Sequence, residues 1–134
     1  GDNTLGYGPT LFTHHAIGNI DITLWGDGEE LREFIYVEDI AKIVSELVSV
    51  QFSGVLNTVS GQSYSFAMIL KLLKDNDDFS FDINQKERSK SKIDHAFCAE
   101  RFYQLLPTFQ FTPLSLGLEK TIARTTMEKG IVNE

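Results

Sequence analysis

The sequence predicts a mixed α/β fold, of the α/β or α+β class, in which strands and helices alternate along the chain. Apolar residues recur with helical spacing in residues 40–48 and alternate with polar ones, as in a half-buried strand, in residues 79–83. The 134 residues suit one domain or part of a larger one. A hydrophobic fraction of 42% with 23% charged residues is enough to build a buried core.

The first elements lie on either side of a glycine-containing turn. We expect residues 1–9, with three glycines and a proline, to be irregular, and residues 11–18 to form a short helix. Residues 22–39 predict a β-hairpin, because an apolar run and an alternating run flank Asp27-Gly28, a pair that tolerates the positive φ of tight turns. If residues 31–37 are extended, side chains at alternate positions share a face, and these are Arg32, Phe34 and Tyr36.

Two interpretations of Arg32 remain open from the local pattern. Its planar guanidinium could bind a phosphate or carboxylate through two hydrogen bonds, with the aromatic rings beside a flat ligand. It could instead lie over the rings with its charged end in water, and the local pattern alone favours this second interpretation.

The middle of the chain predicts two helices separated by a strand. An apolar stripe with helical spacing follows the acidic pair Glu38-Asp39, and we interpret Asp39 as part of the helix start rather than as a catalytic residue. Residues 54–60 predict a short buried strand. Ser65 is a suitable N-cap for the second helix, whose apolar residues lie on one face.

The last third predicts a strand, a basic stretch and two helices. The strand is expected at residues 79–83, one helix from Ala99 to Pro107 and another from Leu114 toward Lys129, ending at Gly130. Cys98 is expected to be buried. If the basic stretch is extended, four cations project to one side: Lys86, Arg88, Lys90 and Lys92. They could form a charged edge that discourages aggregation, or a surface that attracts an anion, and the pattern alone favours the charged edge.

Composition excludes several classes of function. The net charge of −7 argues against binding to nucleic acid or to an anionic membrane. Cys98 is the single cysteine, which excludes an internal disulfide and a thiolate zinc site, and no metal site is expected. No apolar run approaches the roughly 20 residues that span a bilayer, and no signal peptide opens the sequence, so we expect a cytoplasmic protein.

Five segments, in their order along the chain, resemble motifs of one family. They are Tyr7-Gly8-Pro9, Leu24-Trp25-Gly26-Asp27-Gly28, Arg32-Glu33-Phe34-Ile35-Tyr36-Val37-Glu38-Asp39-Ile40-Ala41, Leu56-Asn57-Thr58-Val59-Ser60-Gly61, and Leu114 with Gly117-Leu118. The chain thereby resembles the extended short-chain dehydrogenase/reductase family, whose members are NAD(P)-dependent epimerases, dehydratases and reductases of nucleotide-diphosphate sugars. The resemblance implies a nucleotide-diphosphate sugar as ligand and NAD or NADP as cofactor of the intact parent enzyme.

The resemblance also implies a set of substrate-binding residues. The family's arginine at the position of Arg32 reaches the diphosphate, and residues matching Leu24 and Trp25 line the nucleotide end. A second cation joins that clamp, for which Arg88 is the first choice and Lys86 the reserve. Two cations around a diphosphate form charge-assisted hydrogen bonds and fix its orientation.

Two family motifs are missing from the sequence, the glycine-rich dinucleotide loop and the catalytic Tyr-x-x-x-Lys pair. We therefore expect residues 1–134 to be a single substrate-binding domain, the C-terminal portion of such an enzyme, lacking most of the Rossmann domain. No residue is assigned a catalytic role, no cofactor is expected to bind this chain alone, and self-association through the surface covered by the other half is expected.

The predicted function is therefore the nucleotide-diphosphate-sugar-binding portion of an epimerase, dehydratase or reductase. Within the family, the resemblance points to enzymes of the GDP-fucose synthase or UDP-glucose 4-epimerase type. The alternative is a noncatalytic sugar-nucleotide-binding or protein-interaction module that kept the fold.

Overall fold

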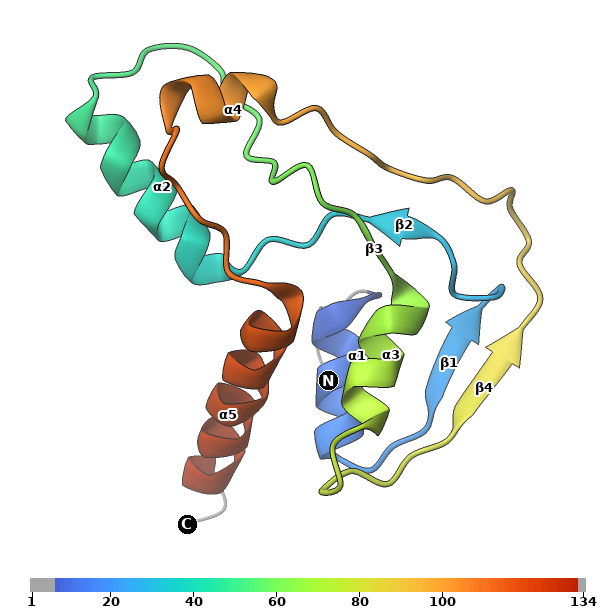
Figure 1. The fold of residues 1–134 in the computed structure, drawn as a ribbon. Coiled ribbons are helices and arrows are strands. Elements are labelled where there is room, and N and C mark those ends of the chain that lie inside the picture. Colours follow the sequence, from blue (N-terminus) through green and yellow to red (C-terminus); the bar gives the residue numbers. More distant parts are fainter. Residues whose placement is uncertain (1–6, 133–134) are drawn as a thin grey trace.

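The structure is a computed structural model that describes residues 7–132, so most of the stretch 1–9 that we expected to be irregular lies outside the described residues. Helices and strands alternate (Figure 1). In chain order the elements are α1 (Pro9–Ile17), β1 (Ile22–Trp25), β2 (Leu31–Arg32), α2 (Val37–Ser49), β3 (Tyr64–Ser65), α3 (Phe66–Lys74), β4 (Ile83–Lys86), α4 (Glu100–Leu105) and α5 (Leu114–Val132).

The strands pair in two small sheets, and the pairing differs from the predicted hairpin. β1 pairs in parallel with β4, with Ile22 opposite Ile83, whereas β2 pairs antiparallel with β3. The turn itself has the predicted backbone, since Gly26 has φ 77° and Gly28 has φ 78°. The hairpin prediction was wrong because the hydrogen-bonding edge of β1 is taken by a strand distant in sequence, while the turn leads the chain into a different sheet.

The helices lie close to the positions that the sequence predicts. α2 carries both acidic residues in its first turn, and the Ser65 hydroxyl caps α3 by accepting a hydrogen bond of 3.1 Å from the Met68 N–H. α5 begins at Leu114 as expected, but it continues through Gly130 to Val132. The expected stop was wrong because a glycine is only unfavourable inside a helix, by about 1 kcal/mol relative to alanine, and does not by itself end one.

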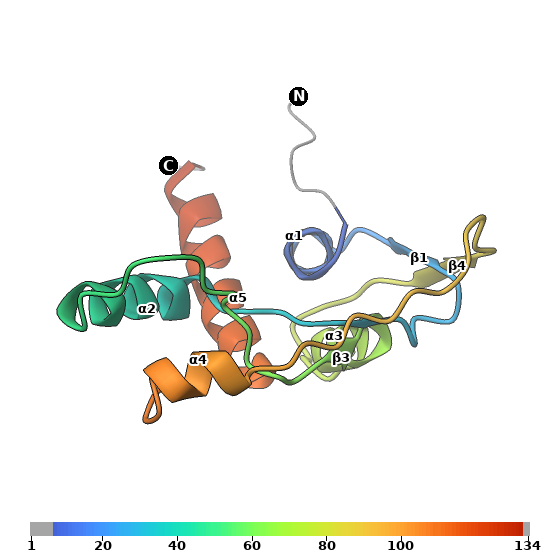
Figure 2. The ribbon, with the colours of Figure 1, turned by 90° about the horizontal axis from the view of Figure 1, so that it is seen from above.

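Two apolar clusters hold the fold together. The first lies among α1, α3, β1 and α5, and its most buried members include Phe12, Ile22, Ile69 and Leu73. The second joins α2 to α4 through Ile43, Phe102, Leu106 and Phe109. Figures 1 and 2 both place α2 and α4 at the end of the molecule opposite the β1/β4 pair. The first cluster therefore supports the sheet that carries the candidate site.

Three local predictions need correction. Residues 54–60 form no β-ladder with any described residue, because no partner strand lies beside them there, and of their side chains Val59 is buried. The strand expected at residues 79–83 begins only at Ile83, although Phe81 is buried as the alternation requires. Cys98 is exposed, while its neighbour Ala99 is buried.

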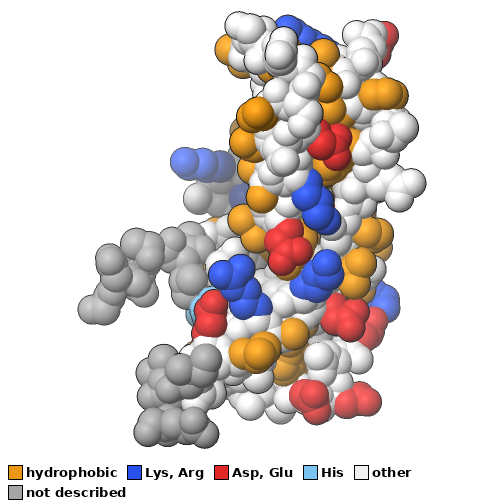
Figure 3. Space-filling model, turned by 90° about the vertical axis from the view of Figure 1, so that its left-hand side faces the viewer, with side chains coloured by type: hydrophobic (Ala, Val, Ile, Leu, Met, Phe, Trp, Pro, Cys, Tyr) orange, Lys and Arg blue, Asp and Glu red, His pale blue; other side chains and the backbone are white. Residues whose placement is uncertain are grey.

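The face formed by α2 and α5 mixes apolar and charged side chains (Figure 3). On α2, Val37, Val44 and Val48 are more than half exposed, on the side of the helix away from buried Ile43. No helix within residues 7–132 is long and apolar enough to cross a membrane.

Candidate functional site

A cavity of about 330 Å³ lies between the ends of β1 and β2 and the segment that follows β4. Basic, aromatic and hydroxyl side chains surround it: Tyr7, Trp25, Glu30, Arg32, Phe66, Arg88, Ser89, Lys90, Ser91 and Ile93. The fold thus brings Arg32 and Arg88, which are far apart in sequence, to one hollow. Three cations beside one carboxylate make the lining net positive in a chain whose overall charge is −7.

Arg32 is placed by the end of β2 and faces this hollow. Its Nη1 donates a 2.8 Å hydrogen bond to the Leu31 carbonyl and a second one to the Ile93 carbonyl, and its Nη2 pairs with Glu30. Its side chain is 26% exposed, so the guanidinium does not extend into bulk water. The bond to Ile93 fastens the segment after β4 against β2.

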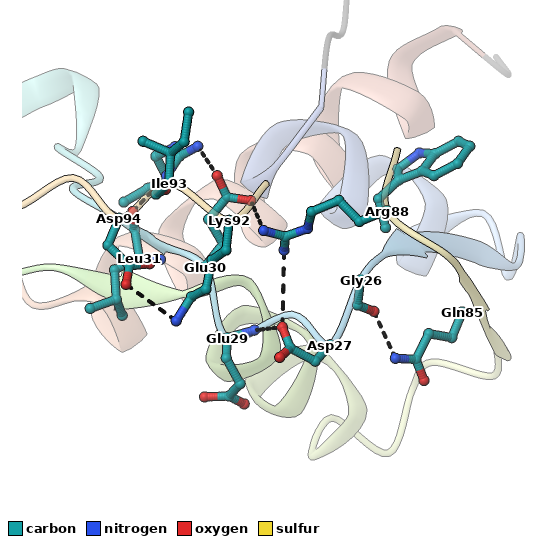
Figure 4. A network of polar contacts seen from close by, with 12 residues as sticks. Gly26, Asp27, Glu29, Glu30, Leu31, Gln85, Arg88, Lys92, Ile93 and Asp94 are labelled. Atoms are coloured by element: carbon teal, nitrogen blue, oxygen red, sulfur yellow. Dashed lines mark hydrogen bonds and ion pairs between the residues drawn. The ribbon is translucent and has the colours of Figure 1, made fainter. Parts of the chain in front are cut away.

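Arg88 approaches from the opposite wall, where β4 has ended. Its Nη1 lies 3.0 Å from the Glu30 Oε2, and its Nη2 lies 4.0 Å from the Asp27 Oδ1 (Figure 4). Within the described residues, Nη1 has an ion-pair contact but no aligned hydrogen bond. Gly26 makes this placement possible, because a Cβ atom there would lie 2.7 Å from both the Nε and the Nη2 of Arg88.

Trp25 presents an aromatic surface beside the two arginines. Its side chain is 47% exposed, and the Lys86 Nζ lies 5.5 Å from the ring centroid, within cation–π range. The Trp25 N–H donates a 3.2 Å hydrogen bond to the Tyr7 hydroxyl, and burial raises the pKa of Tyr7. An exposed indole next to paired guanidiniums can stack a flat ring whose attached phosphates reach the cations.

The five residues predicted to bind the substrate take different positions. Trp25, Arg32 and Arg88 line the cavity. Lys86 lines a neighbouring open hollow of about 580 Å³, which it shares with Arg88. Leu24 lies in the first apolar cluster with 6% of its surface exposed, and it is not part of the cavity lining.

Sequence reasoning missed the role of Glu30 in the cavity wall, and it noted Tyr7 only within an irregular stretch and as part of the family-like segment Tyr7-Gly8-Pro9. Glu30 stands two positions before Arg32, a spacing that puts both side chains on one face of an extended chain. That spacing could have identified the carboxylate as a partner of the guanidinium. For Tyr7, the sequence offers no comparable pattern, because its contact with Trp25 depends on tertiary packing.

A second hollow of about 400 Å³ lies between α1, residues 33–37 and the start of α5. Its lining is mainly apolar and contains no Lys or Arg among the described residues. Its carboxylate is Glu33, whose Oε1 accepts hydrogen bonds from the Ser60 N–H and hydroxyl and from the N–H groups of Gly61 and Gln62. The Glu33 Oε2 is buried without a hydrogen-bond partner among the described residues. This hollow is therefore unsuited to an anionic ligand.

Comparison with known proteins agrees with the family resemblance. The model of the NAD dependent epimerase/dehydratase family matches residues 6–57. GDP-L-colitose synthase of Yersinia pseudotuberculosis is 29% identical over 97 residues, covering 67% of this chain and 32% of the relative. The chain is thus homologous, over part of its length, to NAD-dependent nucleotide-sugar enzymes, and it spans about a third of that curated relative.

Solved structures share the fold. An epimerase of Methanothermobacter thermautotrophicus matches with a TM-score of 0.81 and 17% identity, covering 96% of this chain and 39% of that one. UDP-glucose 4-epimerase of Thermotoga maritima, solved with UDP-glucose, matches with a TM-score of 0.72 and 21% identity, covering 89% of this chain and 40% of that one. At these identities the likeness concerns the fold alone.

The family match corrects the predicted position of the chain within the enzyme fold. We expected a C-terminal substrate-binding portion that lacks most of the Rossmann domain. This was wrong: the NAD-dependent family model matches residues 6–57, which assigns that segment to the NAD-binding, Rossmann part. The prediction relied on the resemblance of five short segments to family motifs and on two absent motifs. Short motifs and absent motifs do not by themselves locate a segment in a fold whose layers combine distant stretches of chain.

Relatives of this family use NAD(P), but the described residues do not fit a dinucleotide by themselves. In the Rossmann fold, the pyrophosphate of a dinucleotide lies at a glycine-rich turn that opens a helix with free N–H groups. α1 opens at Gly8-Pro9, and Pro9 has no N–H to donate, whereas Gly26-Asp27-Gly28 connects β1 to β2 rather than to a helix.

Proposed function

We propose that this chain supplies the diphosphate clamp of an NAD(P)-dependent epimerase, dehydratase or reductase of nucleotide-diphosphate sugars. Arg32 and Arg88 bind the two phosphate groups, and Trp25 stacks against the nucleotide base. Lys86, above the Trp25 ring, and Lys90, in the cavity wall, add positive charge around the ligand.

The observation that carries this proposal is the meeting of Arg32 and Arg88 on one cavity. A guanidinium can donate two parallel hydrogen bonds to a phosphate, and two of them on opposite walls suit a ligand with two linked phosphates. Binding energy from this remote part of a substrate can hold the sugar in a fixed position for chemistry elsewhere. The relation of this chain to enzymes of nucleotide sugars supports the same class of ligand.

The direct test is titration calorimetry of the 134-residue chain with UDP-, GDP- and dTDP-sugars. Arg32→Lys is expected to weaken binding about tenfold, because an ammonium cannot form the two-pronged contact. Arg101→Lys is the matched control, since Arg101 is exposed on α4 and away from the cavity lining. Equal affinities of the wild-type chain and Arg32→Lys would remove Arg32 from the clamp.

A second candidate is a noncatalytic sugar-nucleotide-binding module, favoured by the lack of a Tyr-x-x-x-Lys pair in the sequence. It predicts the same ligand affinity and the same loss on Arg32→Lys, but no turnover in any complex. Self-association is part of the first proposal, through exposed Val37, Val44 and Val48 of α2. Light scattering tests it, and a monomer at high concentration would contradict it.

A further inference from the structure

The proposed clamp contains a carboxylate of its own. Glu30 lies between the two guanidiniums: its Oε1 pairs with the Arg32 Nη2, and its Oε2 lies 3.0 Å from the Arg88 Nη1 (Figure 4). The side chains of Glu30, Arg88 and Arg32 are only 17%, 18% and 26% exposed. Charges that are shielded from water to this degree interact more strongly than charges at an open surface.

Glu30 pairs with one terminal nitrogen of each guanidinium, and an incoming anion would compete for these nitrogens. The Nη1 of Arg32 is engaged by the Leu31 and Ile93 carbonyls, and its Nη2 is engaged by Glu30. On the opposite wall, Glu30 also holds the Nη1 of Arg88. A phosphate that enters the cavity meets guanidiniums already neutralised in part, and it meets a like charge between them.

We propose that Glu30 is an internal counter-ion, which a diphosphate displaces from Arg32 and Arg88 when it binds. Without ligand, Glu30 is a positioning residue that holds the two guanidiniums together, and with ligand its charge opposes binding. Asp27 does not take over this role, since it is 4.0 Å from Arg88 and 64% exposed. This inference rests on the proposed function and adds a determinant of affinity and selectivity to it.

The exchange favours ligands with two linked anionic groups. To displace Glu30, a ligand must satisfy two guanidiniums on opposite walls of the cavity at once. Pyrophosphate has a phosphate for each arginine, whereas inorganic phosphate, like the Glu30 carboxylate, must share a single group between both guanidiniums and carries less negative charge. The wild-type chain is therefore expected to prefer pyrophosphate over phosphate.

The test is titration calorimetry of the full 134-residue chain with pyrophosphate and with phosphate. Glu30→Gln is expected to bind pyrophosphate about tenfold more tightly than the wild type, and to prefer it less strongly over phosphate. Glu29→Gln is the matched control, because Glu29 is the adjacent exposed residue and does not line the cavity. It removes the same charge, and its affinity is expected to stay within about twofold of wild type.

A second measurement covers the case in which Glu30→Gln is destabilised. Glu30→Gln leaves two shielded guanidiniums without their counter-ion, which should lower the melting temperature of the chain. Pyrophosphate should restore it, so the rise in melting temperature on adding pyrophosphate should be larger for Glu30→Gln than for the wild type. Glu30→Asp keeps the charge but is too short to reach both arginines, and its pyrophosphate affinity should fall between those of Glu30→Gln and the wild type.

The outcomes separate this inference from the function on which it rests. If the wild type and Glu30→Gln both bind neither pyrophosphate nor a sugar nucleotide, the proposed function fails and the inference fails with it. A different result would separate the two. If pyrophosphate binds the wild type but not Arg32→Ala, the diphosphate clamp is supported. If Glu30→Gln then binds no more tightly than the wild type, the counter-ion role of Glu30 is refuted.

Discussion

Gly26→Ala tests the central contact of the candidate site without removing any charge. Gly26 has φ 77°, and an added Cβ atom would lie 2.7 Å from the Nε and Nη2 of Arg88 and 3.1 Å from its Cζ. The guanidinium must then leave its position beside Glu30. The substitution should therefore affect both the stability of the chain and its affinity for a diphosphate.

The magnitude follows from two separate terms. An alanine in the left-handed region costs about 1–2 kcal/mol of unfolding free energy. Separating Arg88 from Glu30, a pair 3.0 Å apart with both side chains less than a fifth exposed, costs about 1 kcal/mol more. The expected loss is about 2–3 kcal/mol, the sum of the backbone and ion-pair terms.

Urea unfolding of a double-mutant cycle isolates the second term. In an Arg88→Ala background the clashing guanidinium is gone, so Gly26→Ala should cost only the backbone term of about 1–2 kcal/mol. The expected coupling between the two positions is about 1 kcal/mol. Gly54→Ala is a control for positive φ alone, because its added Cβ atom would meet only Phe52, at 3.6 Å.

The reasoning is refuted if Gly26→Ala costs the same in both backgrounds. Arg88 would then not depend on the missing Cβ of Gly26. Pyrophosphate affinity gives an independent readout, since Gly26→Ala should weaken binding and Gly54→Ala should not.

Three further predictions concern packing, hydrogen bonding and pH. Asp39→Ala should lower the unfolding free energy by about 2–4 kcal/mol, because buried Asp39 accepts bonds of 2.7 and 2.8 Å from the Thr112 N–H and hydroxyl. Phe102→Ala should cost about 3–5 kcal/mol by opening a cavity in the second cluster. The Leu31 N–H, bonded to Asp94 at 2.9 Å, lowers the pKa of Asp94 below 3.8, so the stability it contributes should be lost as pH falls below 3.8.

Each of these has its own contradicting result. If Asp39→Ala unfolds at the same denaturant midpoint as the wild type, the N–H and hydroxyl of Thr112 must find other hydrogen-bond acceptors in the variant. A Phe102→Ala chain as stable as the wild type would place this ring outside the packed core. Because the pKa of Asp94 is lowered in the folded chain, its contribution to stability is present at higher pH and is lost in acid. Asp94→Asn should therefore lack this acid-sensitive part of the pH–stability curve. Equal pH dependence in both chains would show that Asp94 does not cause the loss.

The sequence predicts features that depend on neighbouring residues. Helical spacing from Ile40 to Val48 defines α2, and Ser65 caps α3 as expected, because both depend on contacts within a few turns. The positive φ of Gly26 and Gly28 is equally local. The strand that pairs with β1 cannot be predicted in this way, because distant strands compete for the same edge of β1.

The candidate site shows the same division. No periodicity relates Arg32 to Arg88, and only the family resemblance suggested that they meet. Leu24 and Trp25 are neighbours in a strand, so one side chain faces the core and the other faces outward. The sequence pattern alone does not say which of the two faces the core. The i, i+2 relation of Glu30 to Arg32 was available, but the direction of the chain after the turn was not.

The four hydrogen bonds accepted by one oxygen of Glu33 have a mechanical consequence. The two apolar clusters share no member, and polar links such as Glu33 to residues 60–62 and Asp39 to Thr112 connect their ends of the molecule. Apolar packing tolerates gradual sliding, whereas hydrogen bonds break when their direction changes by a few tens of degrees. The two clusters are therefore joined by directional polar contacts as well as by the chain itself, and loss of the Glu33 carboxylate would remove one set of these contacts while the bonds between Asp39 and Thr112 remain.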